Sequence, residues 1–400
     1  MKKLMLLGGL RYLVPVIKAA KEMGHHVITC DYLPDNIAHK YSDEYCNVSI
    51  TDKEAVLKVA KQLNIDGIMS FAVDPGVATA AYVSEQLNLP SAGPYKSIQI
   101  LQNKGLFREF LEKHNFNVPK SKSYNQIDKA LQSFDYFDLP VIVKPVDSAG
   151  SKGVSKVTNE EELETAIKYA LQFSESKSFI IEEFLEIKGF SSDSDCFSVE
   201  GEFTFVSFSG QRFDSKSPNP YTPSAYSWPS TISDENQEYL KKELQRLISL
   251  LNMNSSLYNI EVRVTEDYTP YIMEVSPRGG GNRLSEMLLY STGVDLISRA
   301  IQAALGEEID TTPKTFKYNG YWAEIILYSN VAGRFKELKI VDQIRDNIVE
   351  IDLRVENGDN VKAFTAANDA IGTIVLKFEN PDILDYILVN YTKFIKIIVK

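Results

Sequence analysis

The sequence predicts an α/β protein whose C-terminal part is α+β. Two observations support this class. Short apolar strands alternate with helical segments over residues 1–95, and a run of β-hairpins follows, of which Tyr258–Arg278 is the clearest. We expect a parallel N-terminal domain at residues 1–95, a larger domain at 96–305 and a small α+β domain at 306–400.

Residues 1–95 are expected to form a parallel βαβ sheet. Apolar runs predict strands at Lys3–Leu7, His26–Cys30 and Gly67–Phe71. Helical spacing of apolar residues predicts helices at Val14–Met23, Lys53–Leu63 and Gly76–Leu87. The loops after these strands carry Gly8, Gly9, Asp31 and Asp74, at the sheet edge where such folds place ligands.

Residues 96–305 are expected to mix helices with antiparallel strands. Helices are predicted at Lys96–Lys113, Glu160–Phe173, Asn236–Leu251 and Glu286–Leu305. Strands are predicted at Pro140–Pro145 and Ser178–Phe184, with a hairpin of Cys196–Val199 and Glu202–Ser209. The segment Phe213–Ser230 is rich in Ser, Pro and Tyr, and it is expected to be a long loop with a function in substrate recognition. The last domain is expected to contain strands and one helix, with turns at Gly358 and Gly372.

Two glutamates are expected to face each other in the hairpin Tyr258–Arg278. A hairpin that is symmetric about its central turn pairs Val264 with Tyr271 and places Glu261 opposite Glu274. Opposed side chains lie roughly 5 Å apart, and opposed like charges destabilise a sheet. A divalent cation between them removes that repulsion, and oxygen ligands favour Mg²⁺ or Mn²⁺ over zinc. The alternative is that one glutamate is solvated and the register differs by two residues.

Two lysines lie in segments that suit phosphate binding. Lys144 ends a predicted strand and precedes a loop with Gly150 and Gly153, where backbone N–H groups can close on phosphate oxygens. The spacing is not that of a Walker A motif, and the alternative is an ordinary turn. Lys104 is either a second phosphate contact or a solvated lysine on a helix.

Two further segments each admit a structural and a functional interpretation. The apolar run Phe179–Leu185 ends in acids, so it is either an edge strand that meets solvent or a hinge that reads a purine edge. The run Arg278–Arg283 contains three glycines, which let the backbone approach a ligand closely. An arginine beside them can stabilise phosphoryl or acyl-phosphate charge. The alternative for this run is a flexible turn with a surface arginine.

Composition excludes several classes of partner. The chain has 400 residues and a net charge of −11, without a long basic run, which argues against non-specific nucleic-acid binding. Its three cysteines lack CxxC spacing, which favours a reducing compartment. Its four histidines lack zinc-type spacing. No segment holds the ~18 apolar residues that cross a membrane. We therefore predict a cytoplasmic protein without nucleic-acid or membrane partners.

In this order and spacing, these segments resemble the ATP-grasp superfamily. The resemblance is to its carboxylate–amine ligases, of the phosphoribosylglycinamide synthetase, carbamoyl-phosphate synthase large-subunit and L-amino acid ligase kind. The matching segments are Gly8-Gly9, Asn103-Lys104, Val143-Lys144-Pro145, Gly150–Gly153, Glu182–Leu185, Asn259-Ile260-Glu261 and Glu274–Arg278. The resemblance covers roughly residues 1–305, and the tail around Asp359–Val361 and Ala370–Gly372 is similar to the closing domain of such ligases.

The resemblance implies roles for residues at the matching positions. ATP with Mg²⁺ or Mn²⁺ would be the cofactor, the Gly150–Gly153 loop would be a mobile lid, and Arg278 and Lys144 would be catalytic. The ATP-binding residues would be Lys104, Lys144, Ser148, Gly150, Ser151, Lys152, Gly153, Glu182, Glu183, Phe184 and Leu185. The metal ligands would be Glu261, Glu274 and Ser276. Substrate contacts are expected from Arg11, Asp74, Arg212, Gly279, Gly280 and Asn282.

Two positions depart from the family pattern. Ser276 stands where the family usually has a metal-binding asparagine, which leaves the number of metal ions open. The acidic residue that usually contacts ribose is expected near Gly189 or Phe190, and neither is acidic. Glu186 and Asp193 are the two candidates to replace it.

The expected function is an ATP-dependent ligase that joins a small-molecule carboxylate to an amine through an acyl phosphate. One alternative is an ATP-grasp carboxylase or carbamoyl-phosphate-type enzyme that uses bicarbonate. Another is a dinucleotide-dependent oxidoreductase, because Gly8-Gly9 and Asp31 mimic part of a Rossmann fingerprint, although G-x-G-x-x-G is absent. The third is a nucleotide-binding protein without turnover. A homodimer is expected because dimers are common in the family.

Overall fold

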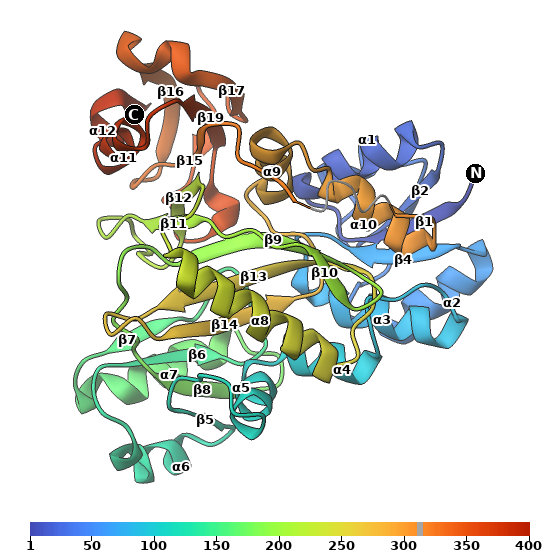
Figure 1. The fold of residues 1–400 in the computed structure, drawn as a ribbon, viewed down its shortest axis with the longest axis horizontal. Helices are drawn as coiled ribbons and strands as arrows, with labels where there is room; N and C mark the ends of the chain where they lie inside the picture. The colour runs from blue at the N-terminus through green and yellow to red at the C-terminus, as the bar shows by residue number, and fades with distance from the viewer. Residues whose placement is uncertain (310–314) are drawn as a thin grey trace.

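The structure is a computed structural model that describes residues 1–309 and 315–400. It confirms the mixed α/β class, with a parallel sheet at the N-terminus and antiparallel sheets after it. Figure 1 shows the N-terminal unit in blue beside the central strands, a small green sheet at the opposite end from the red C-terminal unit, and the central strands between them.

The N-terminal sheet has the strand order β3-β2-β1-β4, and all its neighbours are parallel as predicted. Its strands are β1 (Lys3–Leu7), β2 (His26–Cys30), β3 (Glu44–Cys46) and β4 (Gly67–Ser70). Its helices are α1 (Val14–Glu22), α2 (Lys53–Leu63) and α3 (Asp74–Leu87). The strands are nearly continuous in buried apolar residues, as expected for a sheet covered on both faces.

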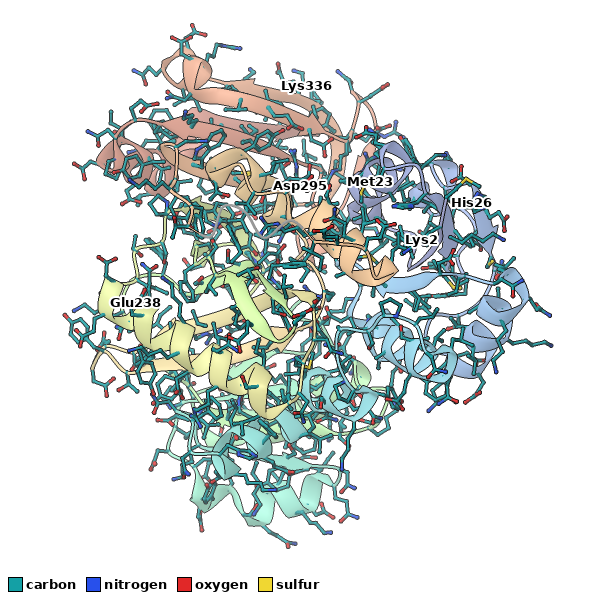
Figure 2. The ribbon with its side chains drawn as sticks, turned by 45° about the vertical axis from the view of Figure 1, so that its right-hand side comes forward. Lys2, Met23, His26, Glu238, Asp295 and Lys336 are labelled. Carbon is teal, nitrogen blue, oxygen red and sulfur yellow. The ribbon has the colours of Figure 1, made fainter. Side chains whose placement is uncertain are left out.

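A helix from much later in the chain completes this unit. The chain passes through α9 (Leu284–Thr292) and then α10 (Leu296–Leu305), which packs against α1 and β4 (Figure 1). Gly67 permits the close approach, because a Cβ there would lie 2.2 Å from the Ala304 carbonyl oxygen. Lys2 Nζ donates to the Leu305 carbonyl at 2.5 Å, and Figure 2 shows Lys2 beside the end of this helix. The last helix of the middle segment therefore fixes the N-terminal unit to the rest of the molecule.

Two antiparallel sheets form the middle of the molecule. The first has the order β5-β8-β6-β7, with strands β5 (Ser121–Tyr124), β6 (Val141–Pro145), β7 (Ser155–Val157) and β8 (Phe179–Glu183). The second has the order β10-β9-β13-β14, with strands β9 (Ser192–Val199), β10 (Glu202–Phe205), β13 (Ser256–Val264) and β14 (Pro270–Ser276). The helices of this region are α4 (Tyr95–Gln102), α5 (Lys104–Lys113), α6 (Ile127–Gln132), α7 (Leu163–Gln172) and α8 (Asp234–Leu250). Helix α5 contacts β5 and β8, and α4 contacts β14, so these two helices bridge the two sheets.

The prediction of one long loop at Phe213–Ser230 is wrong. Residues Pro223–Trp228 form β12, which pairs with β11 (Gly210–Phe213) and with β15 (Tyr321–Leu327) of the C-terminal part. The Ser- and Pro-rich composition does not favour a strand by itself. The strand forms because β15, nearly a hundred residues later, supplies the hydrogen-bonding edge.

The C-terminal unit is built on the sheet that β12 joins. That sheet has the order β11-β12-β15-β19-β17, with β17 (Ile348–Leu353) and β19 (Gly372–Phe378). A second sheet has the order β18-β16-β20, with β16 (Gly333–Ile340), β18 (Asn360–Val361) and β20 (Ile395–Val399). Helices α11 (Pro381–Val389) and α12 (Tyr391–Phe394) complete the unit, and Figure 2 labels Lys336 on its outer side. Across the described ranges, no helix has both the length and the apolar character needed to span a bilayer.

Candidate functional site

The structure places Glu261 directly opposite Glu274, as the sequence predicted. The predicted pairing of Val264 with Tyr271 is wrong by one residue, because Val264 pairs with Pro270. A β-bulge between these two points supplies one extra residue, Met273, and shifts the register back before Glu274. The displaced turn and the bulge compensate, so the two carboxylates still meet.

Each glutamate has a cation within ion-pair distance. Arg263 Nη2 lies 3.0 Å from Glu261 Oε1, and Lys104 Nζ lies 3.3 Å from Glu274 Oε2. The side chains of Glu261 and Glu274 keep 28% and 32% exposure, so both carboxylates can reach a ligand from the open side. A pair of carboxylates of this kind suits Mg²⁺ that takes most of its ligands from phosphate oxygens and water.

Two cations converge on the buried carboxylate Glu182. Lys144 on β6 ion-pairs with one oxygen of Glu182 on β8, and Arg108 on α5 donates to the other at 2.8 Å. Burial alone would raise the pKa of Glu182, but Arg108 and Lys144 outweigh it and lower this pKa to about 2. Burial, together with the nearby Arg108, lowers the pKa of Lys144. Arg108 also donates to the carbonyl of the bulged Met273 at 2.8 Å, which links the small sheet to the glutamate hairpin.

The predicted lid lies between β6 and β7 and touches Lys104. Lys104 is the first residue of α5, and its Nζ donates to the Ser148 carbonyl at 2.9 Å. Gly150 and Gly153 both have left-handed φ angles, +69° and +72°. Ser151 Oγ donates to the Tyr221 carbonyl at 2.8 Å, so the lid meets the loop before β12. Lys152 lies in the same loop with an exposed side chain.

The other residues of the predicted ATP-binding segment, Glu183, Phe184 and Leu185, lie at the end of β8 and directly after it. Glu183 is exposed and accepts a hydrogen bond from the Lys120 amide at 3.3 Å. Lys156 Nζ lies 3.6 Å from the ring centroid of Phe184, and Leu185 is buried. Glu182 and these three residues therefore follow one another on the strand that pairs with the Lys144 strand. Their contact with adenine stays a prediction.

Arg278 and Ser276 converge on Asp74 of the N-terminal unit. Arg278 donates to both oxygens of Asp74 at 2.9 Å, and Ser276 Oγ donates to Asp74 Oδ1 at 3.0 Å. Burial would raise the pKa of Asp74, but Arg278 and Ser276 hold it below its ordinary value. Ser276 Oγ also accepts from Gln102 Nε2 at 2.8 Å. The hydroxyl that was predicted to bind metal is thus engaged in fixing the N-terminal unit at the end of β14, and its role as a ligand stays a prediction.

Comparison with known proteins agrees with this geometry. Residues 137–286 match the family model described as an ATP-grasp domain. The chain carries an ATP-grasp domain. This stretch runs from the start of the Lys144 strand to beyond Arg278, so it includes the lid, the Glu182 strand and the glutamate hairpin.

Two solved structures match over the whole chain and confirm the predicted resemblance. Phosphoribosylglycinamide synthetase from Anaerococcus prevotii is 25% identical to this chain and has a TM-score of 0.77. The match covers 100% of this chain and 100% of that chain. L-amino acid ligase from Bacillus licheniformis is 20% identical and has a TM-score of 0.83, with 100% of this chain and 99% of that chain covered.

Curated relatives match over shorter shares of their length. Protein y4rH from Sinorhizobium fredii is 25% identical over 68% of this chain and 56% of its own length. The carbamoyl phosphate synthase large chain from Pseudothermotoga lettingae is 23% identical over 74% of this chain and 26% of its own length. The chain therefore spans about half or less of the length of these relatives.

The ATP-grasp domain contains two aspartates that the sequence analysis did not assign to the metal site, the buried Asp195 and the partly buried Asp193. Asp193 and Asp195 on β9 pair with Glu261 and Asn259 of β13. Asn259 Nδ2 donates to Asp193 at 2.6 Å. Burial, reinforced by Glu261, raises the pKa of Asp193 to about 7, and burial raises the pKa of Asp195 to about 6. The sequence analysis predicted this strand only from Cys196 onward. The alternation of Ser and Asp directly before Cys196 could have indicated that the strand begins earlier, at Ser192.

The space beside two of the three glycines is filled by protein atoms. A Cβ on Gly279 would lie 2.3 Å from the Phe71 ring, and one on Gly280 would lie 2.9 Å from Asp195 Oδ1. The Gly280 amide donates to the same oxygen at 2.8 Å. These glycines let the backbone pack closely against the N-terminal unit and β9, which accounts for them without a ligand.

The other predicted substrate residues do not all gather in one place. Asn282 Nδ2 donates to the Tyr226 hydroxyl at 3.3 Å, close to Asp193. Arg212 lies on the other face of its sheet, where its Nη2 contacts Asp385 Oδ1 at 2.6 Å and its guanidinium lies over the Phe190 ring. Arg11 is exposed on the short turn before α1. The structure therefore brings Asp74, Gly280 and Asn282 near the carboxylates and leaves Arg212 and Arg11 apart.

Proposed function

We propose that this chain is an ATP-dependent carboxylate–amine ligase that forms an amide through an acyl phosphate and releases ADP and phosphate. The observation that carries the proposal is the opposition of Glu261 and Glu274, with Lys104 in contact with Glu274. In an ATP-grasp domain, this arrangement provides two carboxylates for Mg²⁺ and a lysine for the phosphates. ATP and Mg²⁺ are the cofactors that we propose.

The residues present fit this metal by the chemistry of their oxygens. Glu261 and Glu274 would hold Mg²⁺, which when bound shields the phosphate charge during transfer. Lys104 reaches both Glu274 and the lid carbonyl of Ser148, so its ammonium can neutralise phosphate between the lid and the hairpin. Lys144 lies near the end of β6, where its ion pair with Glu182 holds its ammonium group in place.

We propose a reaction in two steps, which these positions support. A carboxylate oxygen of the first substrate attacks the γ-phosphorus, and the bond to ADP breaks. The amine nitrogen of the second substrate then attacks the carbonyl carbon, phosphate leaves, and the nitrogen releases a proton. Arg278, fixed by both oxygens of Asp74, would stabilise the charge of the acyl phosphate. The lid would exclude the water that otherwise hydrolyses this intermediate.

Bicarbonate is the second candidate acceptor. The relative named carbamoyl phosphate synthase large chain and a solved biotin carboxylase domain in complex with bicarbonate support it. The two candidates differ in which acceptor stimulates ADP release. We further propose that the protein is cytoplasmic and acts on small molecules, without nucleic acid, as a homodimer.

A screen of ADP release tests this proposal. The chain is incubated with ATP and Mg²⁺ and with carboxylates, amines and bicarbonate in pairs. Dependence on both an organic carboxylate and an amine supports ligation, and turnover with bicarbonate alone favours the second candidate. ATP binding without ADP release under any pairing would show a nucleotide-binding protein without turnover.

A pair of variants tests the metal residues. We expect Glu274→Gln to lower ADP release at least 100-fold, because it removes one charge from the proposed Mg²⁺ site while keeping the side-chain volume. Glu266→Gln is the matched control, since Glu266 is exposed at the turn of the same hairpin. Near-full activity of Glu274→Gln would contradict the metal assignment.

A further inference from the structure

The Arg278–Arg283 loop joins β14 to α9, and each of its ends is held by a different unit of the molecule. At its start, Arg278 donates to both oxygens of Asp74 in the N-terminal unit at 2.9 Å. At its end, Arg283 Nη2 lies 2.8 Å from Glu350 Oε2 on β17 of the C-terminal unit. The loop of the ATP-grasp domain is therefore stretched between the two outer units, and its shape depends on both of them.

The end of this loop has an unfavourable backbone conformation. Asn282 and Arg283 have φ angles of +49° and +56°, which place both residues in the left-handed region. Asparagine enters this region more readily than most residues, whereas arginine rarely does. A backbone in such a conformation persists only where surrounding contacts stabilise it. The contacts of the Arg283 side chain are therefore the first place to look for what holds the turn.

The Arg283 side chain is held mainly by the C-terminal unit. It is 8% exposed, and besides Glu350 its Nη1 donates to Thr373 Oγ1 on β19 at 3.4 Å. Its Nη2 also contacts Glu286 Oε1 at 3.0 Å, but Glu286 belongs to the helix that follows the loop, so this pair ties the loop to no other unit. Glu350 is itself fixed, because it accepts a hydrogen bond from the Tyr290 hydroxyl at 2.7 Å. A charge-assisted pair of this kind can offset the cost of the left-handed turn.

The same turn places Asn282 beside the carboxylates of the proposed site. Asn282 Nδ2 donates to the Tyr226 hydroxyl at 3.3 Å, and that hydroxyl donates to Asp193 Oδ2 at 3.1 Å. Asp193 is the cross-strand neighbour of Glu261, one of the two proposed Mg²⁺ ligands. A turn that relaxed to ordinary right-handed backbone angles would redirect the Asn282 side chain and break this series of contacts.

We infer that Arg283 is a positioning residue, whose pair with Glu350 lets the C-terminal unit hold the Arg278–Arg283 loop in the turn that brings Asn282 to the site. The C-terminal unit thereby helps to organise the site through one ion pair. The effect on turnover rests on the proposed ligase function, whereas the effect on the loop does not depend on it.

Two substitutions of Arg283 separate the ion pair from the backbone conformation. Arg283→Ala and Arg283→Gly both remove the pair with Glu350, but only glycine adopts the left-handed region without a steric cost. The loop of Arg283→Ala should therefore open about tenfold more often than that of the natural chain. The loop of Arg283→Gly should keep its turn and open within about threefold of the natural frequency. A side chain that contacted a substrate directly would instead make the two variants equally defective in turnover.

Hydrogen exchange of the full chain measures the opening of the loop without any turnover. The Gly280 amide donates to Asp195 Oδ1 at 2.8 Å and the Leu284 amide donates to the Gly281 carbonyl at 3.2 Å, so a peptide of residues 279–284 reports on the turn. In Arg283→Ala and in Glu350→Gln, this peptide should exchange about tenfold faster, while peptides of β1 and β2 keep their natural rates. Glu379→Gln is the control, because Glu379 is exposed just after β19. A natural rate for residues 279–284 in Glu350→Gln, or equally faster exchange throughout the chain, would overturn the inference.

ADP release with the best substrate pair of the screen gives a second readout. We expect kcat to fall about tenfold in Arg283→Ala and in Glu350→Gln and to stay within about threefold of the natural value in Arg283→Gly, with the Kd of MgATP unchanged in all three. Equal losses of kcat in the alanine and glycine variants would overturn the inference. If Glu350→Gln does not fold, the comparison of the two Arg283 variants still decides. The expected exchange rates without ADP release under any pairing would contradict the ligase proposal alone.

Discussion

Replacing Glu182 by glutamine isolates the charge that holds Lys144 and Arg108 in place. The pKa of Glu182 falls from 4.5 to about 2 on folding. Each pKa unit corresponds to about 1.4 kcal/mol, so the ionised carboxylate stabilises the native state by about 3 kcal/mol at neutral pH. Because its folded pKa is depressed, this stability is present above pH 4.5 and is lost as the pH falls toward 2. Glu182→Gln should therefore be destabilised by about 3 kcal/mol at pH 7.

Hydrogen exchange measures this effect in the sheet that contains Glu182. Amides of β6 and β8 should exchange about 150-fold faster in Glu182→Gln than in the natural chain at pH 7, the factor that about 3 kcal/mol predicts. Glu183→Gln is the matched control, because the next residue along the chain is exposed. The reasoning fails if Glu182→Gln exchanges at the natural rate. It also fails if the full difference persists at pH 2, where about half of the Glu182 carboxylates in the natural chain are protonated and most of this stabilisation is lost.

Two further predictions concern Asp193 of β9 and two of the three glycines, Gly279 and Gly281. In Mg²⁺-free buffer, the folded state keeps a proton on Asp193 up to about pH 7, whereas the unfolded chain releases it near 3.8, so stability falls as pH rises between these values. Asp193→Asn has no carboxyl group at this position, so its stability does not fall for this reason. Denaturation at pH 4 and pH 8 should show that the free energy of unfolding of the variant, relative to that of the natural chain, rises by roughly 3 to 4 kcal/mol between the two pH values. A constant difference between the two pH values would contradict the raised pKa. Gly279→Ala should lower thermal stability by about 1–3 kcal/mol, because its Cβ would overlap the Phe71 ring. Gly281→Ala has its nearest contact, Tyr12, at 3.9 Å and should unfold at the natural temperature, so equal losses in both variants would refute the packing account.

Local patterns in the sequence were enough to predict the parts of the fold that are formed by segments close together along the chain. The parallel N-terminal sheet follows from the alternation of apolar strands and amphipathic helices, and the glutamate hairpin follows from two apolar runs around a polar turn. Even there, the symmetric turn was misplaced, and the bulge at Met273 restored the opposition of Glu261 and Glu274. The bulge could not be anticipated, because Arg108 from another helix holds the displaced carbonyl.

The remaining parts of the site depend on contacts between distant segments. Asp193 enters the site because β9 pairs with β13, and Asp74 reaches Arg278 because the N-terminal unit packs against the end of β14. Neither pairing leaves a periodic signal in the sequence, since it is decided by which sheet edges and faces meet during folding.

The sequence by itself determined the chemistry that this chain brings together: two opposed glutamates, two lysines, a glycine loop and an arginine. The tertiary structure alone decided that Ser276 and Arg278 both bind Asp74, and that the buried Glu324 carboxylate has no hydrogen-bond partner among the described residues. The physical reason is that residue type sets the available charge and hydrogen bonds, whereas burial and partnership are properties of the assembled sheets.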